Sequence, residues 1–405
     1  MSVLIVGGGA AGLMAAITAA QSGNAVTVLE RNERPARKIL VTGKGRCNVT
    51  NACADLRELI AQIPGNGSFL YSALSRWMPA DTMDFFETHG VPLKVERGRR
   101  VFPASDRAMD IADALVKTCR LLGVTFVHGR AMELLLENGT CLGVRCADGT
   151  ELRADTTIVA TGGLSYPQTG STGDGYALAQ QAGHSIVPTR PSLVGLECHE
   201  GFVSRLAGLA LRNVTLRACA DGQVVFDELG ELLFTHTGVS GPLVLSASAH
   251  LRGGAPYTLE IDLKPGRTAA QLEERLLREI SNHSGRNFIN CLNYLLPKSL
   301  VPVVMALAQL PLDLQGAQMT REQRRRLAEL LKALPLTVTG FRPIEEAVIT
   351  AGGVDVREID PKNMASRRVR GLHFAGEVLD VDAYTGGYNL QIAFATGRAA
   401  VPIEA

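Results

Sequence analysis

The sequence has almost no excess of charge, and this absence excludes several classes of protein. Its 41 Lys and Arg residues face 40 Asp and Glu residues, which gives a formal net charge of +1 at pH 7. Proteins that bind nucleic acid or anionic membranes through surface charge carry a clear basic excess. The short basic runs at 324–326 and 367–368 are therefore interpreted as solvated surface segments. We expect neither a nucleic-acid partner nor a membrane partner.

Long apolar runs are also missing. No stretch reaches the ~18 uninterrupted apolar residues that a membrane-spanning helix requires. The apolar N-terminal segment lacks the basic start of a signal peptide, and the glycines at 7–9 interrupt it. The sequence thus predicts a protein without a transmembrane helix or a secretory leader.

The eight cysteines form no C-x-x-C pair and have no metal-like spacing with histidine. We therefore expect no metal centre and no vicinal redox pair of the kind that a disulfide reductase needs. Scattered thiols of this sort are typical of reduced, mostly buried cysteines. This pattern predicts a cytoplasmic protein.

What the sequence does contain is a glycine-rich turn near its start, in the segment VLIVGGGAAGLMAA. Apolar residues 3–6 predict a buried strand and residues 13–20 predict a helix, with Gly7, Gly9 and Gly12 in the turn between them. In a G-x-G-x-x-G turn the glycines permit a tight turn, backbone access for a pyrophosphate, and close packing of helix on strand. The phosphates then lie against free N–H groups at the helix N-terminus.

A second apolar run, residues 25–29, predicts a strand that ends at Glu30. This acid follows the last glycine by about 18 residues, close to the ~20 at which the dinucleotide pattern places a carboxylate for the adenosine ribose. A purely structural glycine turn is the alternative interpretation. Strand, turn, helix, strand and acid in one unit favour a dinucleotide site.

Glycines at the end of a third predicted strand indicate another close approach of backbone to ligand. Residues 156–160 form a buried run that leads directly into Thr161, Gly162 and Gly163. Small residues are needed where a backbone passes close to a ligand, although most glycines at strand ends are ordinary turns. The glycine-rich stretch 170–175 follows and opens a helix, for which Asp174 could serve simply as a cap.

The C-terminal part has the same pattern of a buried strand followed by glycine turns and a helix. A buried run at 372–375 enters a turn at Gly376 and Glu377, and a second glycine turn at 386–387 opens a helix predicted over 390–400. The N-terminus of such a helix would stabilise negative charge on the electron-rich ring of a reduced flavin. Asp380 could accept a hydrogen bond from a ribityl hydroxyl, or it could be an exposed loop acid.

The residue pattern of the sequence changes near residue 188. Short β-branched runs separated by Gly or Pro then predict a small antiparallel sheet or barrel, and helical periodicity follows. We therefore predict an α/β protein whose discontinuous, Rossmann-like nucleotide-binding domain covers residues 1–190 and 350–405. The inserted domain, 191–349, is expected to be β-rich over 191–268 and helical over 269–335.

Taken together, these motifs resemble those of the YhiN/BaiN-like flavoproteins, also called aminoacetone-oxidase-like FAD-binding enzymes. These belong to the larger group with two dinucleotide-binding domains. The resemblance extends over nearly the whole chain and is most specific in RKILVTGKGRCNVTN at 37–51. Thr42 and Lys44 depart from it, since serine and glycine are common there in the family. Further characteristic segments are 100–103, 160–175 and 376–389.

The resemblance implies an extended FAD, with the inserted domain over its isoalloxazine ring. It assigns the pyrophosphate to the N-terminal glycines, the ribose to Glu30, the adenine to the region of Ala131 and Met132, and the ribityl-flavin part to the 38–48 loop and the C-terminal turns. The full set of expected FAD-binding residues is Gly7, Gly9, Ala10, Ala11, Gly12, Glu30, Arg31, Lys38, Thr42, Gly43, Gly45, Arg46, Cys47, Asn48, Ala131, Met132, Ala160, Thr161, Gly162, Gly376, Glu377, Asp380, Gly387, Tyr388, Asn389 and Leu390.

The sequence does not determine the catalytic residues. Arg46 and Cys47 are candidates because they fall in the flavin-wrapping loop, and Arg100 could anchor an anionic substrate. Tyr384 is a candidate proton donor. Each has a structural alternative: a packing role for the cysteine, loop stabilisation for the arginines, and an ordinary hydrogen bond for the tyrosine.

The predicted activity is that of an FAD-dependent oxidoreductase that exchanges a hydride between flavin N5 and a small organic substrate. No second G-x-G-x-x-G unit is evident, so NAD(P)H, the expected electron donor, would dock only transiently over the flavin. The alternatives are an oxygen-using flavin amine oxidase and a non-enzymatic flavin-binding sensor. The sequence leaves the oligomeric state open.

The glycine turn generates a direct test. Gly9→Glu should purify as a colourless protein, because the added carboxylate would occupy the space of the pyrophosphate and repel its charge. The absorbance of the purified variant in the flavin region measures this. A variant with full yellow absorbance would contradict the placement of the cofactor.

Overall fold

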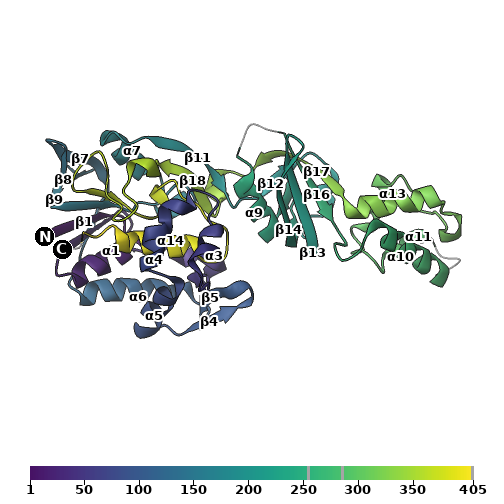
Figure 1. Cartoon of the computed structure of the whole chain (residues 1–405), viewed down its shortest axis with the longest axis horizontal. Helices are drawn as coiled ribbons and strands as arrows, with labels where there is room; N and C mark the ends of the chain where they lie inside the picture. The colour runs from purple at the N-terminus through teal and green to yellow at the C-terminus, as the bar shows by residue number, and fades with distance from the viewer. Residues whose placement is uncertain (253–255, 284–286, 403–405) are drawn as a thin grey trace. The chain divides into compact units, whose positions relative to one another are not determined.

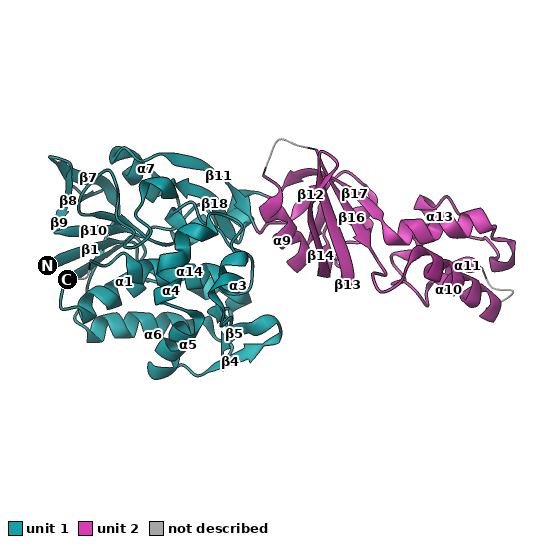
Figure 2. Cartoon of the chain, viewed as in Figure 1, with its two compact units in different colours: residues 1–192, 343–405 teal, residues 193–342 magenta. Residues whose placement is uncertain are grey.

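A five-stranded parallel sheet organises the first of the two units into which the computed structural model divides the chain (Figure 1). This unit comprises residues 1–192 and 343–405, and the second comprises 193–342 (Figure 2). The structure describes residues 1–252, 256–283 and 287–402. Three of the predicted segments therefore lie partly outside the described residues. These are the β-rich segment 191–268 at residues 253–255, the helical segment 269–335 at 284–286, and the C-terminal segment 350–405 at 403–405.

The parallel sheet has the strand order β19-β10-β1-β2-β6. Its central strands are buried on both faces, as an all-parallel sheet covered by helices requires. The chain builds outward from β1 to one edge and then returns to build the other edge, so the order reverses between β1 and β10. The strands are β1 Ser2–Val6, β2 Ala25–Glu30, β6 Thr125–His128, β10 Thr156–Val159 and β19 Leu372–Phe374.

Two helices pack against each other beside this sheet through glycine contacts. The first, α1 (Ala10–Gln21), begins three residues earlier than predicted, because Gly9 rather than a later residue ends the turn. Its partner is α14 (Tyr388–Ala399). A Cβ at Gly397 would lie 2.2 Å from the carbonyl oxygen of Ala11, so only glycine allows the two backbones to come this close.

The remaining elements of the first unit surround the sheet. Residues 38–48, expected to be a loop, begin as helix α2 and continue as a 3₁₀ turn over Thr42–Gly45, because Ile39 is buried and anchors a helical turn. The helices are α2 Arg37–Val41, α3 Leu56–Ala61, α4 Tyr71–Arg76, α5 Pro79–Thr88, α6 Ala108–Leu121 and α7 Asp174–Gln181. The outer strands are β3 Thr50–Asn51, β4 Leu93–Glu96, β5 Arg100–Pro103, β7 Ala131–Glu137, β8 Thr140–Cys146, β9 Glu151–Arg153, β11 Ile186–Ser192 and β18 Ile349–Val354.

Residues 191–192 and 343–349, which the sequence predicts to belong to the inserted domain, lie in the first unit. The physical reason is the antiparallel pairing of β18 with β11, in which Ile349 lies opposite Ser192. The chain therefore leaves the first unit at the end of β11 and re-enters it just before β18, and these two strands pair in one sheet.

The second unit is a closed six-stranded barrel with a helical insertion. The helical segment lies between barrel strands β16 and β17 in the chain, and the unit has a hydrophobic core of its own. The barrel strands are β12 Leu196–Cys198, β13 Ala210–Ala220, β14 Gln223–Phe234, β15 Gly238–Ser240, β16 Tyr257–Asp262 and β17 Leu334–Phe341. The helices are α8 Phe202–Arg205, α9 Pro242–His250, α10 Ala269–Asn282, α11 Phe288–Leu292, α12 Val301–Leu307 and α13 Arg321–Lys332.

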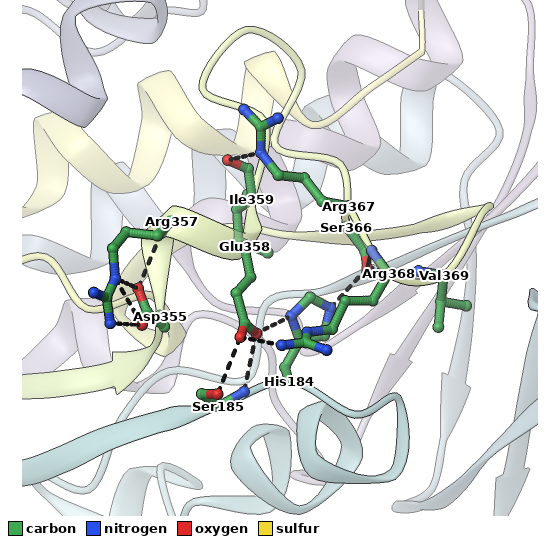
Figure 3. Close-up of polar contacts among 10 residues, drawn as sticks. All are labelled: His184, Ser185, Asp355, Arg357, Glu358, Ile359, Ser366, Arg367, Arg368 and Val369. Atoms are coloured by element: carbon green, nitrogen blue, oxygen red, sulfur yellow. Dashed lines mark hydrogen bonds and ion pairs between the residues drawn. The ribbon is translucent and has the colours of Figure 1, made fainter.

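A polar cluster around Glu358 ties the loop between β18 and β19 to the end of α7 (Figure 3). Glu358 accepts hydrogen bonds from His184 Nδ1 at 3.0 Å and from the backbone N–H of Ser185 at 2.9 Å, and pairs with Arg368 at 2.5 Å. The Arg368 hydrogen bond is the largest cause that lowers the pKa of this carboxyl to about 2. Ser366 Oγ lies 2.7 Å from His184 Nε2 but already accepts from two backbone N–H groups. The cluster therefore braces the loop.

The lowered pKa predicts a pH-dependent stability contribution. Glu358→Gln should reduce the free energy of unfolding by about 2 kcal/mol at about pH 7, the scale of a charged hydrogen bond. Because the folded pKa lies below the unfolded one, the contribution is complete above about pH 4.3 and is lost as the pH falls to about 2. Urea unfolding of both proteins across this range measures it.

The control is Glu33→Gln, which alters an exposed carboxylate with no recorded partner in the described part of the chain. It should leave stability nearly unchanged at every pH. A difference between wild type and Glu358→Gln that is as large at about pH 2 as at about pH 7 would contradict the assigned role.

Candidate functional site

The C-terminal ends of all five parallel strands lead into one pocket of the first unit. This is the position at which open α/β sheets bind ligands, next to the point where strand order reverses. The strand ends that line it are Gly7–Gly9 after β1, Glu30–Asn32 at β2, Gly129–Ala131 after β6, Ala160–Gly162 after β10 and Ala375–Glu377 after β19.

Most of the residues predicted to bind FAD come together here. They come from seven separate stretches of sequence, so the convergence is a property of the fold. The predicted residues that line the pocket are Gly7, Gly9, Ala10, Ala11, Glu30, Arg31, Lys38, Thr42, Ala131, Ala160, Thr161, Gly162, Gly376, Glu377, Asn389 and Leu390.

The turn before α1 has the features that a diphosphate requires. A Cβ at Gly7 would lie 2.6 Å from the carbonyl oxygen of Ala160, whereas one at Gly9 would meet no described atom within 4 Å. No described side chain caps α1, which leaves its first N–H groups to a ligand. Thr161 lines the same pocket, and its Oγ1 is buried without a hydrogen-bond partner among the described residues. The residues present therefore fit the dinucleotide that the turn predicts.

Glu30 and an ion cluster line the pocket beyond the ends of β2 and β6. Glu30 accepts hydrogen bonds from the backbone N–H of Gly8 at 2.7 Å and of Asn32 at 2.8 Å, which fixes its carboxylate. Asp174, at the start of α7, accepts from Arg31 at 3.0 Å and from Arg130 at 2.8 Å. Burial alone would raise the pKa of Asp174, but its hydrogen bonds to Arg130 and Thr172 outweigh this and lower it.

The other expected FAD-binding residues lie outside the pocket wall. Gly12 has a packing role, because a Cβ there would lie 1.9 Å from the carbonyl oxygen of Gly7. Met132, next to Ala131 in β7, is 43% exposed. Asp380 accepts hydrogen bonds from Asn66 and Gly352, and its burial raises its pKa. The residues outside the wall are Gly12, Gly43, Gly45, Arg46, Cys47, Asn48, Met132, Asp380, Gly387 and Tyr388.

In the described part of the chain, this pocket is lined by none of the four catalytic candidates. Arg46 pairs with Glu96 and Asp106, and its guanidinium lies 4.2 Å from the centre of the Phe102 ring. Cys47 is completely buried, which raises the pKa of its thiol to about 12. Arg100 is exposed and donates to the carbonyl oxygen of Arg97. Tyr384 is half-buried outside the pocket wall.

Part of the pocket wall consists of residues that the sequence did not predict. Several of these residues flank recognised motifs, and Gly170, Ser171 and Asp174 lie within the recognised 170–175 stretch, so the predicted set of binding residues was too narrow. Val348 and Ile349 carried no signal, because only the pairing of β18 with β11 brings them to the pocket. The missed residues are Val6, Gly8, Leu29, Asn32, Ala36, Arg37, Ile39, Gly129, Arg130, Thr169, Gly170, Ser171, Asp174, Val348, Ile349, Ala375, Val381, Ile392 and Ala393.

Comparison with known proteins decides the family. Residues 1–402 match the family described as "HI0933-like protein Rossmann domain". The chain belongs to the HI0933-like family. It is 34% identical over 398 residues to an Escherichia coli (strain K12) protein named "Ribosomal RNA dihydrouridine synthase", covering 98% of this chain and 96% of that one. It is 33% identical over 399 residues to the "3-dehydro-bile acid delta(4,6)-reductase" of Clostridium scindens, covering 97% and 96%.

Solved structures support the fold of this HI0933-like protein. A flavocytochrome c3 fumarate reductase in its open conformation aligns with a TM-score of 0.53 at 16% identity, covering 98% of this chain and 77% of that chain. A 3-ketosteroid delta1-dehydrogenase from Sterolibacterium denitrificans aligns with a TM-score of 0.52 at 13% identity, covering 98% of both.

These findings confirm the predicted YhiN/BaiN-type flavoprotein family and the Rossmann-type FAD-binding fold with its barrel. They also confirm an FAD-dependent oxidoreductase as the enzyme class. In residues 1–252, 256–283 and 287–402, every helix is too short or too polar to cross a membrane. The NAD(P)H co-substrate and the cytoplasmic location stay predictions.

The raised pKa of Cys47 predicts that this thiol is unreactive in the folded protein. At about pH 8 almost none of it is ionised, and the thiolate is the species that reacts. Iodoacetamide should therefore leave Cys47 unmodified in native protein and modify it in urea, as peptide mass spectrometry would show. Cys219, which is half-buried, is the internal reference and should react faster. Modification of native Cys47 at the rate of Cys219 would contradict its packing role.

Proposed function

We propose that this HI0933-like protein is an FAD-dependent reductase of small organic substrates that contain a C=C bond conjugated with a carbonyl group. The names of two relatives support this substrate class. A dihydrouridine synthase saturates the C=C bond of a uracil ring next to a carbonyl, and a 3-dehydro-bile acid delta(4,6)-reductase acts on a dienone. Both similarities extend over nearly the whole chain. The shared chemistry is hydride addition to an electron-poor C=C bond.

In this proposal the pocket holds FAD in an extended conformation. The first N–H groups of α1, at Gly9 to Ala11, would bind the diphosphate, and Glu30 would bind the adenosine ribose. Bound FAD would supply the hydride at N5. Asn389 and Leu390 bring the N-terminus of α14 to the pocket, where its positive end favours negative charge on the reduced ring.

The electron donor in this proposal is NADH or NADPH, which docks transiently. Among the described residues, the sheets comprise a single parallel sheet of the nucleotide-binding type. That sheet already directs its strand ends to the FAD pocket. The nicotinamide and the substrate would therefore occupy the same space beside the flavin, one after the other.

The substrate in this proposal is a small molecule rather than an RNA. The chain has a formal net charge of +1, and phosphate-backbone binding depends on a basic excess. The relative named as a ribosomal RNA enzyme makes RNA the necessary comparison in any assay.

Anaerobic absorbance spectroscopy tests the proposal. Addition of NADH or NADPH should bleach the oxidised-flavin band, and a 4-en-3-one steroid or another conjugated enone should restore it. The matched saturated ketone should not restore it, because it lacks the acceptor bond. The parallel assays use uridine-containing RNA and oxygen as acceptors.

Four outcomes would overturn the proposal. Bleaching by an amine in place of a nicotinamide would indicate an oxidase, and no bleaching by any donor would indicate a sensor. Restoration by oxygen alone would exclude an enone reductase. Restoration by RNA alone would move the substrate class to nucleic acid.

A further inference from the structure

A fixed ammonium group lies in the wall of the FAD pocket. Lys38, in α2, lines the pocket, and its Nζ donates to Glu377 Oε2 at 2.7 Å and to Ser165 Oγ at 2.9 Å. The side chains of Lys38 and Glu377 are 24% and 11% exposed. The ion pair is therefore largely shielded from water. Charge interactions in such surroundings are stronger than at a solvent-exposed surface.

The partners of Lys38 are themselves fixed by further hydrogen bonds. Ser165 Oγ donates to Glu377 Oε1 at 2.9 Å, and the backbone N–H of Thr350 donates to the same oxygen at 3.0 Å. Thr350 Oγ1 accepts from the backbone N–H groups of Leu164 and Ser165. Ser165 and Thr350 are completely buried. Two segments far apart in sequence, at Ser165 and Thr350, thus fix the Glu377 carboxylate, and that carboxylate fixes the ammonium of Lys38.

The ammonium has donor capacity left for a ligand. It carries three N–H groups, and the structure records partners for two among the described residues. Ile349, next to Thr350 in β18, contributes an apolar surface to the same pocket, which suits a flavin ring better than a diphosphate. We propose that Lys38 presents its positive charge to the isoalloxazine of bound FAD and stabilises the reduced, anionic form.

Two electrons and one proton convert oxidised FAD into this anion, with dithionite as the electron source in the experiment. A cation beside the ring binds the anion better than the neutral oxidised form, so it raises the midpoint potential. Glu377 and Ser165 are positioning residues, and the carboxylate also weakens the field of the ammonium. We expect Lys38 to favour reduced over oxidised FAD by about tenfold, which equals about 30 mV for a two-electron couple.

The proposed role of Lys38 rests on the part of the proposed function that assigns FAD as the cofactor, and not on the enone substrate. The role of Lys38 and the enone-reductase activity can therefore be disproved separately. The measurements are the midpoint potential of bound FAD and its affinity for the apoprotein, neither of which involves turnover. Lys38→Met should lower the potential, and Lys38→Arg should restore most of the loss. The control is Lys117→Met, which removes an exposed charge on α6 outside the pocket wall and should change neither quantity.

A second variant predicts a shift of opposite sign. Glu377→Gln removes the negative partner and should raise the potential, which loss of structure alone would not do. If Lys38→Met weakens the binding of oxidised and reduced FAD equally, the midpoint potential does not change. That result would overturn the proposal and would assign Lys38 to binding of the diphosphate or to a structural role. If Lys38→Met loses FAD, retention by Lys38→Arg supports the role of charge, and loss by both overturns it. An unchanged or lower potential in Glu377→Gln also overturns it.

Discussion

The close approach of three backbone segments around the start of α1 is the constraint on which the pocket depends. Gly7 lies against Ala160 after β10, Gly12 lies against the carbonyl of Gly7, and Gly397 of α14 lies against the carbonyl of Ala11. A Cβ at any of these three glycines would come within 2.6 Å of a backbone oxygen, which requires the segments to separate. These glycines therefore let the strand ends and the N-terminus of α1 come close enough to form the pocket.

Polar contacts between distant parts of the sequence then complete the pocket wall. Asp174 joins the segments of Arg31 and Arg130, and Glu377 joins α2, the turn after β10 and β18. Each carboxylate has several partners and is partly shielded from water, so each orients its neighbours more strongly than a surface ion pair would. The Glu377 contacts with Lys38 and Ser165 also hold together the two chain segments between which the second unit is inserted.

The described pocket is built from the first unit alone. All pocket-lining residues belong to residues 1–192 and 343–405, while the barrel and its helices have a separate core. Relatives whose names refer to different substrates match this chain at similar identity over nearly its whole length. Different substrates on one fold are consistent with the way that folds carry sites, since substrate choice depends on the residues of the site rather than on the fold.

The sequence by itself determined the nucleotide-binding turn, the acid at Glu30, the parallel strands, the barrel-like insertion and the flavoprotein family, because these depend on local patterns of glycine and apolar residues. It did not determine which residues of the 38–48 segment reach the pocket, since the helical turn of α2 directs Lys38 inward while Cys47 is buried elsewhere. Only the tertiary structure brought Asp174 to Arg130 and Thr350 to Glu377. Such contacts join residues far apart in the chain, and no local pattern records which distant partner a polar side chain will meet.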